Sequence, residues 1–195
     1  MSAQNIVKPT AENLVESINA AKKGKDLPPV HLWNPPFCGD LDMRIARDGT
    51  WFYQGTPIGR PGLVKLFSSI LKREGDQYYL VTPVEKVGIT VDDAPFVAQD
   101  FDPVGNDLRF TTHVGDTAVA GPDHPIRVDR DTTTGEPSPY VLIRANLWAL
   151  IDRKSFYRLV DLGVTETIDD TQWFGVRSGG VFFPIIPMAD LEKTP

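Results

Sequence analysis

The sequence predicts an α+β fold made of two modules, each with antiparallel strands and one amphipathic helix. Three observations predict it. The dipeptide Asp48-Gly49 separates two strand-like segments, a Pro- and Gly-rich corner at residues 55–62 precedes an apolar helical stripe, and after Pro83 short strands alternate with turn residues. We place the first module at residues 1–76 and the second at residues 77–195.

The N-terminal module is expected to begin with a helix from Thr10 to residue 23, because Thr10 suits the N-cap and Gly24 suits the C-terminal stop. Its apolar side consists of Leu14, Val15, Ile18 and Ala21. Residues 30–41 then form a proline-rich loop that contains Trp33. Such a loop either presents its aromatic residue to a ligand or buries it as a plug over a sheet, and both interpretations stay open.

The segment around Asp48-Gly49 predicts a β-hairpin. An Asp-Gly dipeptide tolerates the positive φ angles of a type I′ turn, so we expect a two-residue loop. This loop length predicts the register of the two strands. Ile45 would lie opposite Phe52, and Arg44 opposite Tyr53.

A helix is expected after the Pro- and Gly-rich corner, with Pro61 in its first turn. The apolar residues that follow recur at helical spacing: Leu63, Leu66, Phe67, Ile70 and Leu71. Lys72 and Arg73 would occupy the last turn, where cations suit the helix dipole, and Gly75 would end the helix. Residues 78–82 then return as a strand.

The second module is predicted to be rich in strands, with one helix at residues 153–162 and a final hairpin around Ser178-Gly179. The expected strands are residues 84–91, 96–101, 108–114, 117–120, 125–128 and 140–151. This element order predicts a partly open barrel similar to pleckstrin-homology folds, an analogy that carries no information about a ligand.

Two short internal similarities suggest a duplication as a hypothesis. Residues 47–53 are similar to residues 177–183, and residues 56–59 are similar to residues 124–127.

The composition excludes several classes of function. The 195 residues carry a formal net charge of −6, which argues against a general nucleic-acid binder. The chain has one cysteine and no apolar run of the ~18 residues that a membrane span needs, and residues 1–9 lack the apolar core of a signal peptide. We therefore expect a cytoplasmic protein without an integral membrane segment.

Catalytic and metal-binding motifs are weak in this sequence. Residues 100–107 begin like a calcium loop, but Val104 and Thr111 stand where the motif needs an oxygen ligand and a bidentate Glu, so we interpret the segment as an acidic turn. The cysteine and histidines show no zinc-ligand spacing: Cys38, His31, His113 and His124. We expect no catalytic residue, no metal and no cofactor. A nucleophilic Cys38 paired with a histidine stays an alternative to a buried thiol.

Polar residues among apolar neighbours are the candidates for a ligand site. Arginines and a lysine that converge near an aromatic ring would hold an anion and stack a planar group. Taken singly, each of these residues fits a salt bridge or an exposed strand position equally well. The candidate ligand-binding residues are Trp33, Cys38, Arg44, Arg60, Glu85, Lys86 and Arg144.

Residues 33–43 and the segment from Thr82 to Phe96 resemble the bacterial domain-of-unknown-function family 1285. Three shorter patterns also fit this family, at residues 48–51, 55–58 and 66–71. The resemblance implies a duplicated α+β scaffold whose second part is similar to a pleckstrin-homology domain. It also implies a pocket for a nucleotide-like ligand where the two parts meet, a role in signalling, and no established enzymatic activity.

These observations favour a non-catalytic regulatory protein that binds a small anionic, nucleotide-like ligand between its two modules. Trp33 would stack on the ligand, while Arg60, Lys86 and Arg144 would supply charge. The first alternative is a protein–protein interaction module that uses an exposed sheet edge or the Trp33 loop. The second alternative is a hydrolase or transferase that uses Cys38 or His113.

Overall fold

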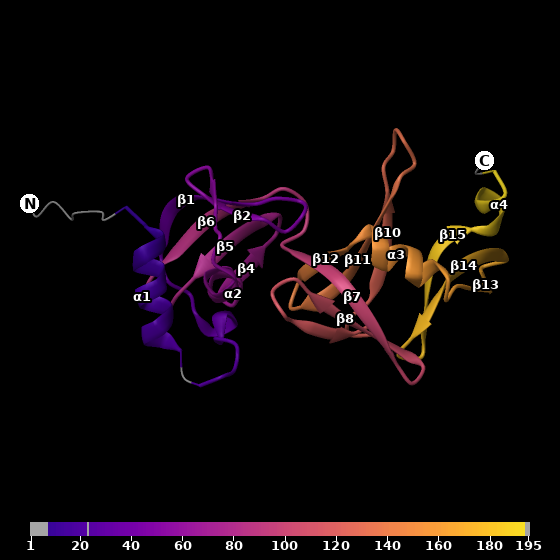
Figure 1. Cartoon of the computed structure of the whole chain (residues 1–195), viewed down its shortest axis with the longest axis horizontal. Helices are drawn as coiled ribbons and strands as arrows, with labels where there is room; N and C mark the ends of the chain where they lie inside the picture. The colour runs from indigo at the N-terminus through magenta and orange to yellow at the C-terminus, as the bar shows by residue number, and fades with distance from the viewer. Residues whose placement is uncertain (1–7, 23, 194–195) are drawn as a thin grey trace, which may run out of the picture. The chain divides into compact units, whose positions relative to one another are not determined.

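The computed structural model of the chain describes residues 8–22 and 24–193 (Figure 1). It divides into two compact units, Met1–Asp93 and Ala94–Pro195. Both units combine strands with helices, so the predicted α+β class and the two-module organisation are confirmed. The division lies after Asp93 and not after residue 76, because the two strands that follow residue 76 pair with strands of the first unit.

The first unit consists of a six-stranded sheet, two α-helices and one short 3-10 helix. Its sheet has the strand order β3-β2-β1-β6-β5-β4, with β1 and β6 as a central parallel pair. Its elements are α1 (Ala11–Ala21), η1 (Val30–Leu32), β1 (Phe37–Ile45), β2 (Trp51–Tyr53), β3 (Thr56–Pro57), α2 (Pro61–Ser68), β4 (Leu71–Glu74), β5 (Gln77–Val81) and β6 (Lys86–Val91).

The helix α1 begins as predicted. The side-chain oxygen of Thr10 accepts a hydrogen bond from the backbone N–H of Asn13 at 3.2 Å, which satisfies one of the free donors of the first turn. Leu14 and Ile18 of its apolar side are fully buried. Residue 23, the predicted last residue of the helix, lies outside the described residues.

The helix α2 ends at Ser68, earlier than its apolar stripe predicts. The Ser68 hydroxyl donates to the backbone carbonyl of Lys65 at 2.8 Å, a bond that competes with continuation of the helix. The residues from Leu71 to Glu74 form β4, so they leave the helix and pair with β5. Gly75, with a φ of 60°, lies in the β4–β5 turn and does not end a helix.

Both α-helices contact the same face of the first sheet. The Phe67 ring of α2 stacks on Trp51 of β2, with 6.3 Å between ring centres and an angle of 20° between planes. Tyr53 shares this face with Trp51, and its hydroxyl accepts a 3.4 Å hydrogen bond from the backbone N–H of Ala11 in α1. The core of this unit therefore lies between the helices and the Trp51 face, and the opposite face carries most of the exposed strand residues.

The second unit contains a six-stranded sheet, a three-stranded sheet and two helices. Its elements are β7 (Phe96–Val104), β8 (Asp107–Thr112), β9 (Thr117–Val119), β10 (Ile126–Arg130), β11 (Pro137–Arg144), β12 (Leu147–Ile151), α3 (Arg153–Val160), β13 (Val164–Ile168), β14 (Thr171–Ser178), β15 (Val181–Pro187) and α4 (Met188–Leu191).

The six-stranded sheet of the second unit is curled into a half-barrel. Its strand order is β10-β11-β12-β7-β8-β9, yet β9 contacts β11, which lies four places away in that order. The β14–β15 hairpin lies against two separate parts of the curl, because β15 contacts the edge strand β10 and β14 contacts β8, the strand next to the other edge. The buried Ser178 hydroxyl accepts a bond from the N–H of Leu108 at 2.8 Å and donates to the carbonyl of Ala120 at 2.7 Å. This side chain ties the hairpin to the sheet.

The two six-stranded sheets share one connectivity. Each consists of two antiparallel three-stranded segments joined by a central parallel pair, which is β1 with β6 in the first unit and β7 with β12 in the second. This shared connectivity agrees with the duplication hypothesis. However, the segments that correspond in the two sheets are not the segments whose sequences are similar. The β1–β2 hairpin corresponds to β7–β8, whereas residues 177–183 form the β14–β15 turn. Likewise β3 corresponds to β9, whereas residues 124–127 lead into β10.

Two local predictions in the second unit were incomplete. Residues 140–151, expected as one strand, form the β11–β12 hairpin, in which Ala145 adopts a φ of 47°. The strand β13 was not predicted at all. The helix expected at residues 153–162 is confirmed as α3, and the Asp152 carboxylate caps it by accepting from the N–H of Ser155 at 2.7 Å.

In the part of the chain that the structure describes, no helix has both the length and the apolar character that a membrane crossing requires.

Candidate functional site

The loop of the β1–β2 hairpin has three residues, and its length positions the candidate site. The N–H of Gly49 donates to the carbonyl of Ala46, and the N–H of Ala46 donates to the carbonyl of Thr50, both at 2.9 Å. In this loop only Gly49 has a positive φ, of 87°. This pattern is a type I turn followed by a left-handed glycine, in place of the predicted two-residue type I′ turn.

The longer loop shifts the register by one residue. Arg44 pairs with Phe52, and Ile45 pairs with Trp51. The predicted pairs, Arg44 with Tyr53 and Ile45 with Phe52, were therefore wrong. A shift of one residue exchanges the two faces of a strand, so Trp51 enters the core and Phe52 joins Arg44 on the opposite face.

We call the sheet face that carries Arg44 the open face. Directly paired residues of neighbouring strands point to the same side of a sheet, so the strand pairings define its membership. It includes Phe37, Asp40 and Arg44 of β1, Phe52 of β2, Lys72 and Glu74 of β4, Gln77, Tyr79 and the buried Val81 of β5, and Lys86, Gly88 and Thr90 of β6.

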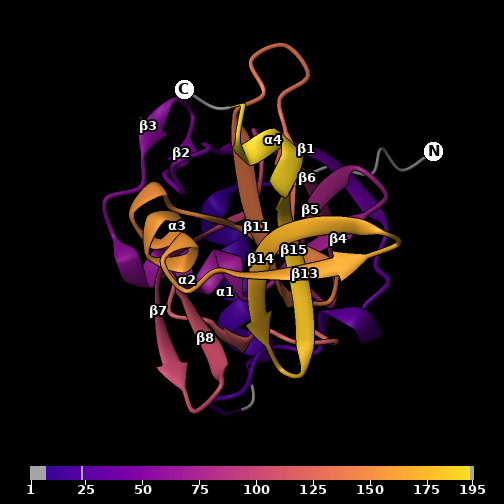
Figure 2. The same ribbon diagram turned by 90° about the vertical axis from the view of Figure 1, so that its right-hand side faces the viewer.

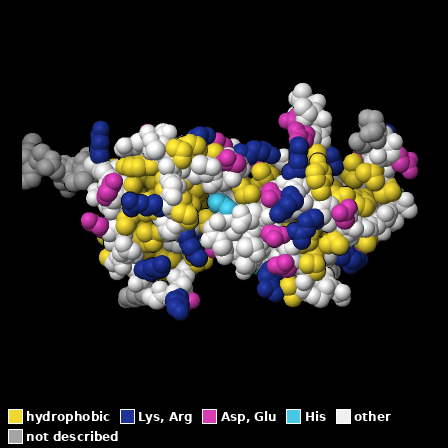
Figure 3. Space-filling model, in the orientation of Figure 1, with side chains coloured by type: hydrophobic (Ala, Val, Ile, Leu, Met, Phe, Trp, Pro, Cys, Tyr) yellow, Lys and Arg dark blue, Asp and Glu magenta, His cyan; other side chains and the backbone are white. Residues whose placement is uncertain are grey.

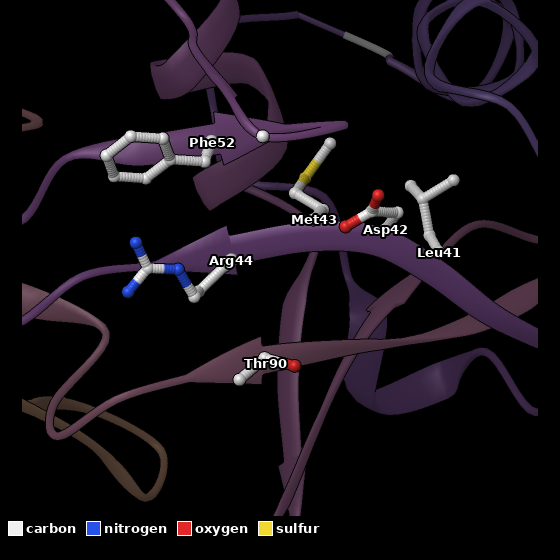
Figure 4. A pocket seen from close by; sticks show the side chains of 7 residues that line it. Leu41, Asp42, Met43, Arg44, Phe52 and Thr90 are labelled. Carbon is white, nitrogen blue, oxygen red and sulfur yellow. The ribbon is translucent and has the colours of Figure 1, made fainter.

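A shallow pocket of about 240 Å³ lies on the open face (Figure 4). Its lining residues are Leu41, Asp42, Met43, Arg44, Phe52, Gly55 and Thr90. The Arg44 and Phe52 side chains extend alongside each other from neighbouring strands, and the guanidinium carbon lies 4.7 Å from the ring centre. Thr90 stands beside Arg44 on the next strand. The pocket thus combines a planar cation, an aromatic ring and a hydroxyl.

Arg44 also forms an ion pair with Asp92 at 2.5 Å. Both side chains are partly exposed, and exposed ion pairs contribute only about 0–1 kcal/mol to stability. The pairing therefore orients the guanidinium without removing it from solvent. Arg47 and Asp93 form a second ion pair at 3.0 Å, adjacent in sequence to the first.

A second polar group lies on the open face around Lys86. Its ammonium is 2.9 Å from the Glu74 carboxylate and 4.7 Å from the centre of the Tyr79 ring. Lys72 pairs with the same carboxylate at 3.1 Å, and the hydrogen bonds from Lys86 and Lys72 hold the pKa of Glu74 below its usual value. The Phe37 ring meets Tyr79 edge to face, with 6.1 Å between ring centres. Lys86 is therefore held by a carboxylate and a ring.

The other predicted site residues of the first unit have different surroundings. Trp33 is half-buried and lines a separate pocket of about 550 Å³ with Pro83 and the C-terminal end of α1. Arg60 is exposed at the N-cap of α2. The Cys38 thiol donates to the carbonyl of Pro36 at 3.4 Å.

Glu85 is half-buried, and this burial raises the pKa of its carboxyl group, while a hydrogen bond with Ser17 acts in the opposite direction. Because Ser17 belongs to α1, Glu85 lies at the helix-covered side of the unit.

Arg144 belongs to the second unit. It pairs with Asp116 at 3.2 Å, and its guanidinium carbon lies 5.2 Å from the centre of the Phe96 ring. His113 of the catalytic alternative also lies in this unit, and its Nδ1 accepts from the N–H of Val97 at 3.2 Å. The acidic turn at residues 100–107 forms the end of the β7–β8 hairpin. Within residues 8–22 and 24–193, no group of three or more His, Cys, Asp or Glu side chains is arranged to hold a metal ion.

The structure brings Arg44 and Lys86 to one face of one sheet, which strand pairing across β1 and β6 explains. The sequence interpretation missed their neighbours Phe52, Thr90 and Asp92. The register error hid Phe52. A glycine at the third loop position was the signal for the correct register, because three-residue hairpin loops place their left-handed residue there.

Together the fold and the site define a two-unit α+β protein with a shallow pocket of about 240 Å³ on an open sheet face. Residues 28–94 match the model described as "Domain of unknown function (DUF1285), N-terminal domain", and residues 95–185 match "Protein of unknown function (DUF1285), C-terminal domain". The chain belongs to the DUF1285 family.

Two crystal structures of DUF1285 family proteins are similar to this chain. The protein from Silicibacter pomeroyi DSS-3 is 65% identical with a TM-score of 0.82, over 92% of this chain and 97% of that chain. The protein from Shewanella baltica OS155 is 30% identical with a TM-score of 0.51, over 62% of this chain and 91% of that chain. None of the curated proteins matches this chain.

Proposed function

We propose that this protein is a non-catalytic regulatory protein that binds a small anionic ligand with a planar, nucleotide-like ring at the Arg44–Phe52 pocket. The pairing of Arg44 with Phe52 carries the proposal, because it sets a guanidinium against an aromatic face. A guanidinium binds phosphate or carboxylate through paired N–H groups, and its plane also stacks on flat rings. The Thr90 hydroxyl adds a neutral donor and acceptor at the pocket wall.

The neighbouring carboxylates limit the charge of the ligand. Asp42 lines the pocket, and Asp92 contacts the guanidinium directly. Both repel a polyanion, so a single phosphate or carboxylate group is favoured over a triphosphate. The pocket volume of about 240 Å³ is below the ~300–1,000 Å³ usual for pockets that enclose a drug-sized ligand, so we expect the pocket to enclose a small ligand only in part. We therefore expect a nucleoside monophosphate, a cyclic nucleotide or a compound of similar size.

The test is a thermal unfolding series with nucleoside mono-, di- and triphosphates and cyclic nucleotides at fixed pH and salt. A ligand that binds only the folded state stabilises it by about 2.7 kcal/mol at a hundredfold excess over its Kd. Arg44→Gln should abolish the rise in melting temperature. Arg109→Gln, which changes an exposed strand arginine of the second unit, should retain it. Asp92→Asn should strengthen binding, because it removes the carboxylate that competes for Arg44.

A melting temperature that no nucleotide changes, or a change that survives Arg44→Gln, would count against this function. The protein–protein interaction module is then the second candidate. One observation favours it: the Phe37 side chain on the same open face is 55% exposed, beside Tyr79 and Lys86. Aromatic side chains are enriched in protein–protein interfaces. In that case Phe37→Ala should abolish partner binding while Arg44→Gln leaves it intact.

A further inference from the structure

The strand β13 is an unprotected edge of the three-stranded sheet of the second unit (Figure 2). In the described part of the chain it pairs with β14 on one side only. Its sequence, Val-Thr-Glu-Thr-Ile, contains no Pro, Gly or Lys, and its pairing with β14 runs without a bulge. Proteins usually protect edge strands with these devices, because a bare edge offers its backbone to another strand.

The free edge presents the backbone groups of Thr165 and Thr167. The β13–β14 turn consists of Asp169 and Asp170, with φ angles of 46° and 61°, and Ile168 faces Thr171 across it. In a two-residue hairpin the residues that flank the turn form a hydrogen-bonded pair, and such residues alternate along the strand. The residues at 164, 166 and 168 therefore bond to β14, while those at 165 and 167 direct N–H and C=O outward.

The strand is also symmetric about Glu166. If two copies of β13 pair antiparallel about this residue, Thr165 lies opposite Thr167 twice, and Val164 lies opposite Ile168 twice. Each Thr pair exchanges two backbone hydrogen bonds, and each Val–Ile pair joins exposed apolar side chains. Val164 is 42% exposed and Ile168 is 38% exposed in the single chain. Figure 3 shows hydrophobic side chains between charged ones over this end of the unit.

The ion pair between Glu166 and Arg177 reduces the charge repulsion that this register would otherwise cause. Two Glu166 carboxylates would lie directly opposite each other, and like charges at such positions destabilise a sheet. Arg177 of the neighbouring strand neutralises Glu166 through two hydrogen bonds, from Nε to Oε1 and from Nη2 to Oε2, the second of 2.7 Å. Each Glu166 carboxylate would thus enter the interface already paired with Arg177 of its own copy, which reaches it diagonally from β14.

The edge is held rigidly enough to act as a template. The face of the sheet opposite Glu166 carries the buried residues Val176, Ser178 and Phe183, which pack into the second unit. Ser178 bonds to two backbone groups of the six-stranded sheet, and the N–H of Gly179 donates to the Asp107 carboxylate at 2.7 Å. Little ordering entropy is therefore lost when a second strand binds.

We propose that two copies of this chain associate by antiparallel pairing of their β13 strands about Glu166, which joins the two three-stranded sheets into one six-stranded sheet. The interface is small, so the dimer forms reversibly as the concentration rises. The proposed dimer uses β13, which is distant in sequence from Arg44. The dimer proposal is therefore tested independently of the ligand proposal.

Sedimentation velocity of the full chain over a wide concentration range tests the association. We expect a shift from the 21.6 kDa chain toward twice that mass. Thr165→Pro should abolish the shift, because it removes an outward N–H and leaves the bonds to β14 in place. Thr165→Val keeps that N–H and should behave as the wild type. A chain that is monomeric at every concentration, or a dimer that survives Thr165→Pro, overturns the proposal.

The ion pair between Arg177 and Glu166 allows a second sedimentation experiment that does not depend on how the proline variant folds. Arg177→Gln leaves two unneutralised glutamates opposite each other and should weaken the dimer, and adding Glu166→Gln should restore it. Equal dimerisation of the wild type and Arg177→Gln would overturn the Glu166-centred register.

Disulfide trapping tests the register directly, in a Cys38→Ser background that leaves no other thiol. The two copies of residue 166 would form a non-hydrogen-bonded pair, with Cα atoms ~4.5 Å apart, a separation that a disulfide can span. Glu166→Cys should therefore give a covalent dimer on a non-reducing gel under mild oxidation. Ile168→Cys should not, because residue 168 faces residue 164 of the other copy. The reverse result would overturn the proposal.

Discussion

Arg44 lies directly opposite Phe52 in the β1–β2 hairpin, and its guanidinium carbon is 4.7 Å from the centre of the Phe52 ring. The three-residue loop that ends at Gly49 determines this pairing, because the loop length sets the register of the two strands. With a two-residue loop, Phe52 would share a face with Ile45, and Arg44 would lie opposite Tyr53. The extra loop residue places the aromatic ring beside the cation, and the proposed ligand site depends on that placement.

Replacing Gly49 should destabilise the first unit. Its φ of 87° is in the left-handed region, where a side chain costs roughly 1–2 kcal/mol. We therefore expect Gly49→Ala to lower the free energy of unfolding by about that amount in urea titrations. Gly62→Ala is the matched control, because Gly62 lies in α2 with open space around it and alanine favours a helix by ~1 kcal/mol. Equal effects of the two substitutions would contradict the assigned loop geometry.

Two buried strand glycines should differ sharply in their tolerance of alanine. A Cβ on Gly175 would meet the backbone carbonyl oxygen of Phe183 at 2.2 Å, and a backbone atom cannot move aside. A Cβ on Gly88 would meet the Asp40 carboxylate at 2.1 Å, and that side chain can rotate into solvent. We expect Gly175→Ala to cost at least 1–3 kcal/mol, as overpacking does, and Gly88→Ala to cost less. Chemical denaturation of both variants measures the difference, and the opposite order would show that the β14–β15 packing is looser than described.

Removing the Ser178 hydroxyl should loosen the closure of the curled sheet. Ser178→Ala leaves the buried N–H of Leu108 and the carbonyl of Ala120 without their partner, and each unsatisfied group costs ~1–3 kcal/mol. Hydrogen exchange should show faster exchange of the Leu108 amide. Ser138→Ala, on β11 of the same sheet, is the comparison for a partly exposed strand serine. An unchanged exchange rate at Leu108 would argue that this hydroxyl does not hold the hairpin in place.

The carboxyl groups of Glu85 and Glu74 should give opposite pH dependences. Burial raises the pKa of Glu85 above its ordinary value of 4.5, so the folded state binds this proton more tightly than the unfolded chain. The stability from that proton is present below the unfolded pKa and is lost as the pH rises through the folded pKa. Glu85→Gln should therefore raise the melting temperature at neutral pH, and its advantage should shrink as the pH falls.

The hydrogen bonds from Lys86 and Lys72 lower the pKa of Glu74, so the sign reverses. This stability is present above the unfolded pKa and is lost as the pH falls through the folded pKa. Glu74→Gln should lower the melting temperature at neutral pH, with the difference vanishing in acid. Thermal unfolding of both variants from neutral to acidic pH checks the pair. Parallel curves for the two variants would contradict the assigned environments.

The sequence by itself determined the elements whose signals are local. Thr10 caps α1, the apolar spacing of α1 buries Leu14 and Ile18, and the turn residues of the second unit separate most of its strands, because caps, periodicity and turns act over a few residues. The sequence also indicated the family, because the segments that resemble it are short and contiguous.

Only the tertiary structure decided the rest. The residues from Leu71 to Glu74 fit a helical stripe, but pairing with β5 made them a strand. The parallel pairing of β1 with β6 brought Lys86 to the open face of Arg44, and the division after Asp93 put Arg144 in the other unit. Strand pairing joins residues that are far apart in sequence, and a single loop residue changes which face each side chain occupies. For this reason the fold class could be predicted from the sequence, whereas the composition of the site could not.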